Sequence, residues 1–419
     1  MAAFGRLCLA SVIAASAIAE STTAELKDLY AAHRWPELRD RLAVVEAAPL
    51  YREAVAAAFR DMATAEKQLN EILRRRPRAE EARDAYDHLA HLYLDAGLYR
   101  RFRVTMEAKW ATVTDRSMVE QERAAYAAFL PLPDQLVKRR RRFRLRDATD
   151  LWLPCTINGT AVTFFLDTGA GISAISESEA KRLHLEFTGA QSGVSSSTGK
   201  HTQVRTAVAQ DLMVGDIRLR DVSFIVLPDE NEPWVHLAEG RRGLLGVPVL
   251  LAFGTLTRAK DGTLDVGSTS WNVHRQKSNL YFADDHLAVQ VVIRGQHLSA
   301  TLDTGAETTD LYAGLINSIP SLRTESIESG TTDVRGVAGA ERFESITVRN
   351  LEIGLDAFKA VLRPAHILLQ QVGPTCCVGN VGLDLLKQAD SFQIDFRNMR
   401  LEMRGKRVSE SDSKTRTPL

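Results

Sequence analysis

The chain has 419 residues, of which 45% are hydrophobic and 25% are charged, a composition typical of globular proteins. Its length exceeds what one ordinary hydrophobic core needs, so we expect two or three domains. Lysine plus arginine and aspartate plus glutamate both total 53, and this balance creates no global field that would attract a polyanion. We therefore predict that the chain binds no nucleic acid.

Residues 1–19 have the pattern of a secretory signal peptide. Arg6 precedes an apolar run from Leu7 to Ala19, and Ala17-Ile18-Ala19 supplies the small residues of a cleavage site. The run is shorter than the roughly 20 apolar residues that cross a bilayer, and no other stretch approaches that length. We expect an exported protein, periplasmic or secreted, without a stable membrane span after cleavage. An uncleaved anchor is the alternative.

The cysteines bear on the redox state of the exported chain. Cys8 lies in the predicted signal peptide, which leaves Cys155, Cys376 and Cys377 in an oxidising compartment. We expect one disulfide and one free thiol, with Cys155 bonded to either of the other two. The sequence contains no CxxC and no HExxH, so we predict no metal site and no cofactor.

Residues 20–130 are predicted to form an all-α domain. Apolar residues recur there at intervals of three and four, which is typical of amphipathic helices. Leu89, Leu92 and Tyr93 precede Ala96-Gly97-Leu98-Tyr99, a helix followed by a glycine turn and a second helix. The pattern is similar to tetratricopeptide-type (TPR-like) helical hairpins. It suits either a packed appendage or a surface for a protein partner.

Residues 131–150 are predicted to be a basic linker or strand. Pro131-Leu132-Pro133 ends the helical region, because proline lacks a backbone donor. The run from Lys138 to Arg146 then suits a solvated linker or an exposed edge strand. The alternative is a basic segment that covers an acidic site before activation. At the other end of the chain, residues 406–419 are polar and are expected to be disordered.

From Leu151 onward the sequence is typical of β-structure and contains an internal repeat. Ile157 lies ten residues before the first Asp167-Thr168-Gly169-Ala170 motif. Ile293 likewise lies ten residues before the second motif, Asp303-Thr304-Gly305-Ala306. Two copies in matched apolar contexts are a far stronger signal than a single tripeptide.

Further landmarks keep the same register in both copies. Gly246 of Leu244-Leu245-Gly246 follows Asp167 by 79 residues (246 − 167), and Gly382 of Asn380-Val381-Gly382 follows Asp303 by 79 (382 − 303). Each copy ends in a predicted hairpin, from Thr255 to Val266 and from Phe392 to Met403. The repeat therefore extends over both β regions.

On these motifs the chain resembles the bacterial retropepsin-like and pepsin-like aspartyl proteases with two fused Asp-Thr-Gly lobes, over about residues 148–405. The resemblance implies a multidomain protein with an all-β bilobal aspartic-peptidase fold behind the helical domain. Residues 151–275 would form lobe 1 and residues 280–405 would form lobe 2.

The resemblance also implies that Asp167 and Asp303 are the catalytic residues. Two carboxylates held about 3 Å apart cannot both ionise, so the pair shares one proton. One carboxyl group then acts as base on a bound water, and the other acts as acid on the scissile carbonyl. This chemistry needs no serine or cysteine nucleophile and no metal.

Family likeness assigns supporting roles to the residues that follow each aspartate. Thr168 and Thr304 would hydrogen-bond across the lobe interface. Gly169 and Gly305 would let backbone amides approach the carboxylates, where a side chain would intrude. Gly246 and Gly382, with the apolar residues before them, would thread behind each aspartate loop as structural support.

The fourth position of each motif is alanine, at Ala170 and Ala306, where pepsin-type enzymes usually have serine. Without those hydroxyl donors the anionic form of the pair loses support, so we predict a pH optimum less acidic than that of pepsin.

Substrate-binding flaps are expected at two turn sequences, from Ser195 to Gly199 and from Arg335 to Gly339. The residues assigned to them are Ser197, Gly199, Gly336 and Gly339. Neither copy carries the flap tyrosine of pepsin-type enzymes, which leaves open whether one flap or two is used.

The sequence thus predicts a monomeric aspartic endopeptidase that binds an extended peptide or protein substrate in the cleft between two lobes. The alternative is a catalytically weak peptide-binding or scaffold protein of the cell envelope that acts through its helical domain. A third possibility is a processing enzyme that its helices recruit to one envelope partner.

Overall fold

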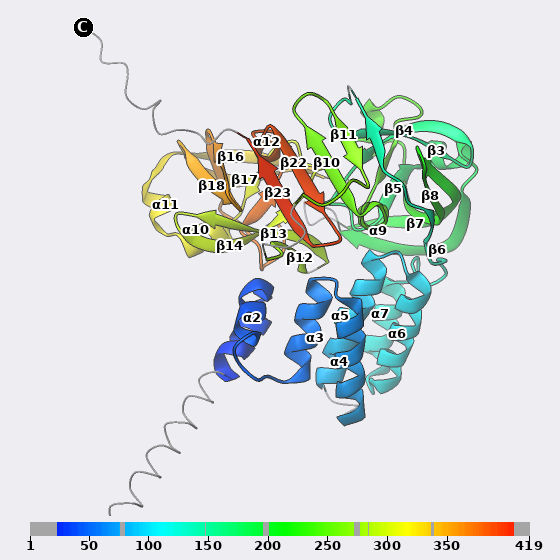
Figure 1. Cartoon of the computed structure of the whole chain (residues 1–419), viewed down its shortest axis with the longest axis horizontal. Helices are drawn as coiled ribbons and strands as arrows, with labels where there is room; N and C mark the ends of the chain where they lie inside the picture. Colours follow the sequence, from blue (N-terminus) through cyan, green and yellow to red (C-terminus); the bar gives the residue numbers. More distant parts are fainter. Residues whose placement is uncertain are drawn as a thin grey trace, which may run out of the picture.

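The computed structural model describes residues 23–75, 80–146, 148–195, 201–271, 277–283, 285–336 and 339–405. A layer of helices lies along one side of a larger β body (Figure 1). The predicted signal peptide, the predicted C-terminal tail, and the flap residues Ser197 and Gly199 lie outside the described residues.

The N-terminal region is helical, as predicted. Residues 23–31 are helical, and α2 (Trp35–Leu42), α3 (Pro49–Ala58), α4 (Met62–Arg75), α5 (Glu80–Asp95), α6 (Tyr99–Thr112) and α7 (Arg116–Ala125) follow. Gly97, with φ +69°, forms the predicted turn between α5 and α6. Asp115 caps α7 by accepting hydrogen bonds from the backbone of Ser117 and Met118. Trp110 and Phe102 are buried inside this layer.

The first repeat builds an eight-stranded sheet. Its strands are β1 (Leu136–Arg139), β3 (Trp152–Ile157), β4 (Thr160–Leu166), β5 (Ser173–Ser176), β6 (Glu186–Ser195), β7 (His201–Val214), β8 (Ile217–Leu227) and β9 (Gly243–Leu245). The order is β1-β8-β5-β9-β4-β3-β7-β6, and β8 also pairs with β7. The helices α8 (Glu177–Arg182) and α9 (Val247–Phe253), and the 3₁₀ helix η1 (Trp234–His236), lie within the same repeat.

The second repeat builds a ten-stranded sheet. Its strands are β12 (Leu280–Ala283), β13 (His286–Ile293), β14 (Gln296–Leu302), β15 (Asp310–Leu311), β16 (Ser326–Gly336), β17 (Gly339–Val348), β18 (Leu351–Leu355), β19 (Phe358–Leu362), β20 (Ala365–Leu368) and β21 (Gly379–Val381). The order is β16-β17-β20-β15-β21-β14-β13-β18-β19, with β12 paired to β13. The short helices are α10 (Ala313–Ser318), α11 (Ser321–Thr324) and α12 (Leu383–Leu386).

A third sheet joins the two repeats. Its five strands are β2 (Phe143–Leu145), β10 (Thr255–Ala259), β11 (Leu264–Val266), β22 (Ser391–Asp395) and β23 (Arg400–Arg404), in the order β2-β11-β10-β22-β23. Hairpins β10–β11 and β22–β23 are the two predicted from the sequence, and β10 pairs antiparallel with β22. They lie side by side in Figure 1. The end of each repeat is thus fixed to the end of the other.

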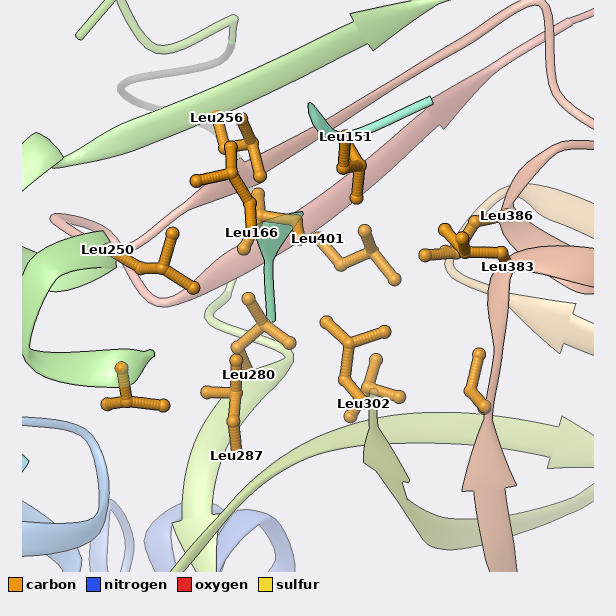
Figure 2. Packing of buried hydrophobic residues seen from close by; sticks show 14 of the residues in the cluster. Leu151, Leu166, Leu250, Leu256, Leu280, Leu287, Leu302, Leu383, Leu386 and Leu401 are labelled. Atoms are coloured by element: carbon orange, nitrogen blue, oxygen red, sulfur yellow. The ribbon is translucent and has the colours of Figure 1, made fainter. Parts of the chain in front are cut away.

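One apolar core runs through both repeats. Leu166 and Leu302, which directly precede the two aspartates, are fully buried in the same cluster. Figure 2 shows them among leucines from the shared sheet, including Leu256 and Leu401. The backbone on which each aspartate sits is therefore anchored by close-packed side chains.

The basic segment forms two edge strands. Strand β1 pairs with β8, and β2 pairs with β11. Arg139 forms an ion pair with Asp216 at 3.3 Å, and Arg142 and Arg144 both contact Asp265. Two acidic residues therefore compensate part of the positive charge that these edge strands carry.

The helical layer packs against the β body through buried contacts. The Ala128 backbone N–H donates to Ser192 Oγ at 2.8 Å, and Thr206 Oγ1 donates to the Ala128 carbonyl at 2.9 Å. Gln135 Nε2 donates to the Pro248 carbonyl at 2.9 Å. Two of the hydrophobic clusters contain side chains from both the helices and the sheets.

The expected disulfide does not form, because its cysteines lie in different parts of the fold. Cys155 is buried in the core on β3, where burial raises its pKa to about 12. Cys377 packs beside Tyr281 in another cluster, next to Cys376. None of the three cysteines forms a disulfide.

Within the described ranges, none of the helices is both long and apolar enough to cross a bilayer.

Candidate active site

Both aspartates follow a strand that pairs in parallel with a partner strand. Leu166, at the end of β4, pairs with Leu245 of β9, and Leu302, at the end of β14, pairs with Val381 of β21. The Asp167 backbone N–H donates to the Leu245 carbonyl at 3.0 Å. The Asp303 N–H makes the equivalent bond to the Val381 carbonyl, also at 3.0 Å. The two repeats thus present their aspartates in the same way.

Gly246 and Gly382 lie directly behind the two aspartate loops, where the sequence places them. A Cβ on Gly246 would lie 2.6 Å from the Ala170 carbonyl oxygen, and one on Gly382 would lie 2.6 Å from the Thr308 carbonyl oxygen. Contacts this short exclude any side chain. The glycines therefore let the backbone pass close behind each loop.

Thr168 and Thr304 lock the two loops together. Each backbone N–H donates to the other threonine's Oγ1 at 3.0 Å. Thr168 Oγ1 donates to the Leu302 carbonyl, and Thr304 Oγ1 donates to the Leu166 carbonyl, both at 2.7 Å. Both threonines are buried, so these four bonds are shielded from water.

Gly169 and Gly305 bring the two carboxyl groups together. A Cβ on Gly169 would lie 2.4 Å from Asp303 Cγ, and one on Gly305 would lie 2.7 Å from Asp167 Cγ. Each glycine therefore touches the acid of the opposite repeat. The two acids also act on each other directly, since the charge of Asp303 raises the pKa of Asp167.

Backbone amides hold both carboxylates in place. Gly169 N–H donates to Asp167 Oδ1, and Gly305 N–H donates to Asp303 Oδ1, each at 2.8 Å. A further donor, the Ala306 N–H, reaches Asp303 Oδ1 at 3.1 Å. Because all three bonds end on an Oδ1 atom, they fix the orientation of each carboxyl group and therefore the position of its Oδ2 atom.

The pKa of Asp167 is raised well above its usual value. Burial is the largest cause, followed by the charge of Asp303, while the Gly169 amide opposes the shift in part. A carboxyl group in this setting keeps its proton where an exposed aspartate would lose it. Such a pair can give a proton from one carboxyl group and accept one on the other.

Asn380 makes the site asymmetric, a role that the sequence motifs do not predict. Its Nδ2 donates to Asp303 Oδ2 at 2.9 Å, and Thr301 Oγ1 donates to its Oδ1 at 2.6 Å. The corresponding position of the first repeat, 77 residues beyond Asp167 (244 − 167), is the apolar Leu244. This difference is visible in the sequence when Leu244-Leu245-Gly246 is compared residue by residue with Asn380-Val381-Gly382.

Asp310 is a third carboxyl group near the pair. It lies directly opposite Asn380 in the antiparallel pairing of β15 with β21. Burial, then the charges of Asp303 and Asp384, raise its pKa to about 6. The corresponding residue of the first repeat is Ala174, so this group also belongs to one repeat alone.

The flap predictions fall on two long hairpins. Gly336 and Gly339 pair with each other at the end of β16–β17, and Gly339 has φ +102°. Ser197 and Gly199 belong to the connection between β6 and β7, outside the described residues. The β6–β7 hairpin is held at its middle by the bonds of Ser192 and Thr206 to Ala128.

Within the described segments, the side chains of histidine, cysteine, aspartate and glutamate form no group of three or more that could hold a metal ion.

Residues 153–249 match the model of the aspartyl protease family. Three solved structures are also similar. A retropepsin-like aspartic protease from Rickettsia conorii is 16% identical, with 32% of this chain and 92% of that chain covered and a TM-score of 0.22. The retroviral protease-like domain of Ddi1 from Leishmania major is 20% identical, with 30% and 97% covered and a TM-score of 0.22.

The third structure is EIAV protease in complex with the inhibitor HBY-793, at 18% identity, with 29% and 93% covered and a TM-score of 0.19. No curated protein matches the chain.

Proposed function

We propose that this chain, whose residues 153–249 match the aspartyl protease family model, is an aspartic endopeptidase whose catalytic residues are Asp167 and Asp303. The observation that carries the proposal is the reciprocal contact of each motif glycine with the opposite carboxyl group. Such a contact requires both motifs, one from each repeat, to meet at one place. The family match covers only the first of them.

The reaction follows from two coupled carboxyl groups. The ionised carboxylate takes a proton from a water bound between the acids, and the water oxygen attacks the carbonyl carbon of the peptide. The protonated carboxyl group gives its proton to the carbonyl oxygen, which avoids a separate oxyanion. Thr168 and Thr304 keep the two acids at a fixed separation while the proton positions change.

We propose a bilobal arrangement, in which residues 151–275 and 280–405 form the two lobes and an extended peptide lies between them. The hairpins β6–β7 and β16–β17 would pair with its backbone by strand addition, and alternate side chains would enter pockets. Support comes from the separate sheet that each repeat builds and from the third sheet that joins them.

The remaining features of the proposal rest on the sequence. Residues 1–19 would direct export to the periplasm or beyond, and the protein would act as a monomer. Residues 20–130 would form the helical domain, with TPR-like hairpins, and residues 131–150 the connection to the first lobe. A protein partner would bind through the helices.

Turnover of a mixed peptide library tests the enzymatic assignment. The protein without residues 1–19 should cleave the library and should lose roughly 1,000-fold or more in kcat/KM on Asp303→Asn, because one acid of the pair is lost. Pepstatin should inhibit the wild-type activity. Turnover that survives Asp303→Asn would remove the proposed function, and it would favour the alternative in which the helical domain carries the activity of a scaffold.

A further inference from the structure

We propose that Asn380 is a positioning residue that assigns the two proton-transfer roles, so that Asp303 is the base and Asp167 is the acid. The inference rests on the proposed function and deepens it. In a symmetric pair either carboxyl group could begin the cycle with the proton. Of the two acids, Asp303 is the one that accepts a hydrogen bond from the amide of Asn380.

The orientation of the Asn380 amide is fixed by Thr301. The hydroxyl of Thr301 donates to Asn380 Oδ1 at 2.6 Å, which leaves Nδ2 to donate to Asp303 Oδ2 at 2.9 Å. With a flipped amide, the Thr301 hydroxyl would have to donate to the Gly379 carbonyl at 3.3 Å, a longer bond than the one of 2.6 Å that it makes to Asn380 Oδ1. Thr301 and Asn380 are also paired across β14 and β21, so the backbone holds both side chains.

The hydrogen-bond donors are unequal at the two acids. Asp303 accepts the Gly305 and Ala306 amides on Oδ1 and the Asn380 amide on Oδ2. Asp167 accepts backbone bonds from Gly169 and Ala170.

In the first repeat, Leu244 and Phe165 stand where the second has Asn380 and Thr301, and they are paired in the same register. Neither can donate a side-chain hydrogen bond. Donors favour the ionised carboxylate, so the extra amide places the negative charge on Asp303 and the shared proton on Asp167.

The roles then follow with every proton accounted for. Asp303 takes a proton from water as the water oxygen bonds to the carbonyl carbon, and Asp167 gives its proton to the carbonyl oxygen. The product is a neutral gem-diol. In the second step Asp303 returns its proton to the amide nitrogen as the C–N bond breaks, and Asp167 recovers a proton from the diol. Both acids end as they began.

Other titrating groups face Asp303 and must be separated from its effect. Asp167 is its partner, Asp310 lies beside Asn380 on β15, and Tyr312 follows on the same segment. Asp384 acts on Asp310 in turn. Because the pKa of Asp310 is raised to about 6, its titration overlaps the range in which the pair is measured. The substitution Asp310→Asn removes this overlap.

The test is the pH dependence of kcat/KM in Asn380→Leu, which copies the first repeat. Loss of the amide should move the acidic limb of the profile upward by about one pH unit, with about a tenfold loss of rate below that limb. The same upward shift should remain when Asp310→Asn is present in both proteins. Thr301→Val, which frees the amide to rotate, should shift the limb in the same direction.

The reciprocal swap, Asn380→Leu with Leu244→Asn and Phe165→Thr, moves both the amide and the hydroxyl that orients it to the side of Asp167. This variant should reverse at least half of the upward shift seen in Asn380→Leu. The reason is that the amide again stabilises the anion of one of the two acids. Unfolding midpoints in urea identify a variant that fails to fold, and Thr301→Val then carries the test.

A wild-type profile in folded Asn380→Leu, or in folded Thr301→Val, would overturn the proposal. The proposed function would stay intact after such a wild-type profile. It is tested separately by Asp303→Asn, which is expected to be inactive whichever acid is the base.

Discussion

Gly169 of the first repeat lies against the carboxyl group of Asp303 in the second, so closely that a Cβ would be 2.4 Å from Cγ. Gly305 stands in the same relation to Asp167. Each repeat therefore shapes the site of the other. A pair of acids exists only when both repeats are folded and docked.

This contact predicts the effect of Gly169→Ala. The added methyl group must push the Asp303 carboxyl away from Asp167, and a displacement of about 1 Å should reduce kcat/KM by roughly 100-fold or more. Steady-state cleavage of a library peptide gives the measurement. Gly171→Ala is the matched control, because a Cβ there meets nothing within 4 Å, and it should retain wild-type activity. Equal activity in both variants would contradict the close contact.

The threonine lock predicts that Thr168→Val weakens both stability and turnover. The substitution removes the bond to the Leu302 carbonyl and leaves the buried Thr304 N–H without its acceptor. We expect a loss of roughly 2–3 kcal/mol in the free energy of unfolding in urea, because unsatisfied buried groups are costly. Thr331→Val, on an exposed position of β16, should change it by less than about 0.5 kcal/mol. A loss no larger than that of the control would refute the lock.

The contact between His91 on α5 and Asp285 predicts a pH-dependent stability. His91 Nδ1 lies 2.9 Å from Asp285 Oδ1. Burial lowers the pKa of His91, but the charge and hydrogen bond of Asp285 outweigh it and raise the pKa to about 9, against an ordinary value of 6.5. A raised histidine pKa stabilises the fold fully below 6.5, and the contribution is lost as pH rises through about 9.

Urea unfolding of Asp285→Asn measures this contribution. Because half of the Asp285 side chain is exposed, we expect the variant to be less stable by only about 1 kcal/mol at pH 6. The deficit should disappear at about pH 10, where the histidine is neutral in both states. His91→Gln should add nothing to Asp285→Asn at pH 6. A deficit that is constant with pH would exclude the ion pair as its cause.

The buried interface predicts that the helical layer cannot be removed cleanly. Deletion of residues 23–130 would expose Val204, Val208 and Trp234, which pack in one cluster with helical side chains. It would also break the bonds of Ala128 to Ser192 and Thr206. We expect a truncated chain that aggregates and cleaves no short peptides, as size-exclusion chromatography and peptide assays would show. A monodisperse, active truncation would mean that the helices are a dispensable appendage.

Sequence alone could predict the parts of the site that depend on local geometry. Asp167 and Asp303 were found because each needs the same glycines and the same spacing to Gly246 and Gly382. The spacing to Gly246 and Gly382 acts within one repeat, and the Asp-Thr-Gly motif recurs in both repeats, so together they leave a regular pattern along the chain. The hairpins β10–β11 and β22–β23 were predicted for the same reason.

The missed features depend on residues that meet only in the folded chain. In the sequence, Asn380 belongs to a glycine landmark, whereas its bond to Asp303 bridges 77 residues. In the sequence, the one indication of a special role is that the first repeat has the apolar Leu244 at the corresponding position. The disulfide prediction was wrong because the number of cysteines does not determine how far apart they lie in the fold. Cys155 lies in the core on β3, whereas Cys376 and Cys377 belong to a different hydrophobic cluster.

The central claim is that Asp167 and Asp303 act as one catalytic unit, and a double-mutant cycle on kcat/KM tests it most directly. Asp167→Asn and Asp303→Asn should each lower kcat/KM by roughly 1,000-fold or more. The kcat/KM of the double variant should equal that of the less active single variant within about threefold. Independent losses that multiply in the double variant, or a single variant that keeps its activity, would contradict a shared proton between the two acids.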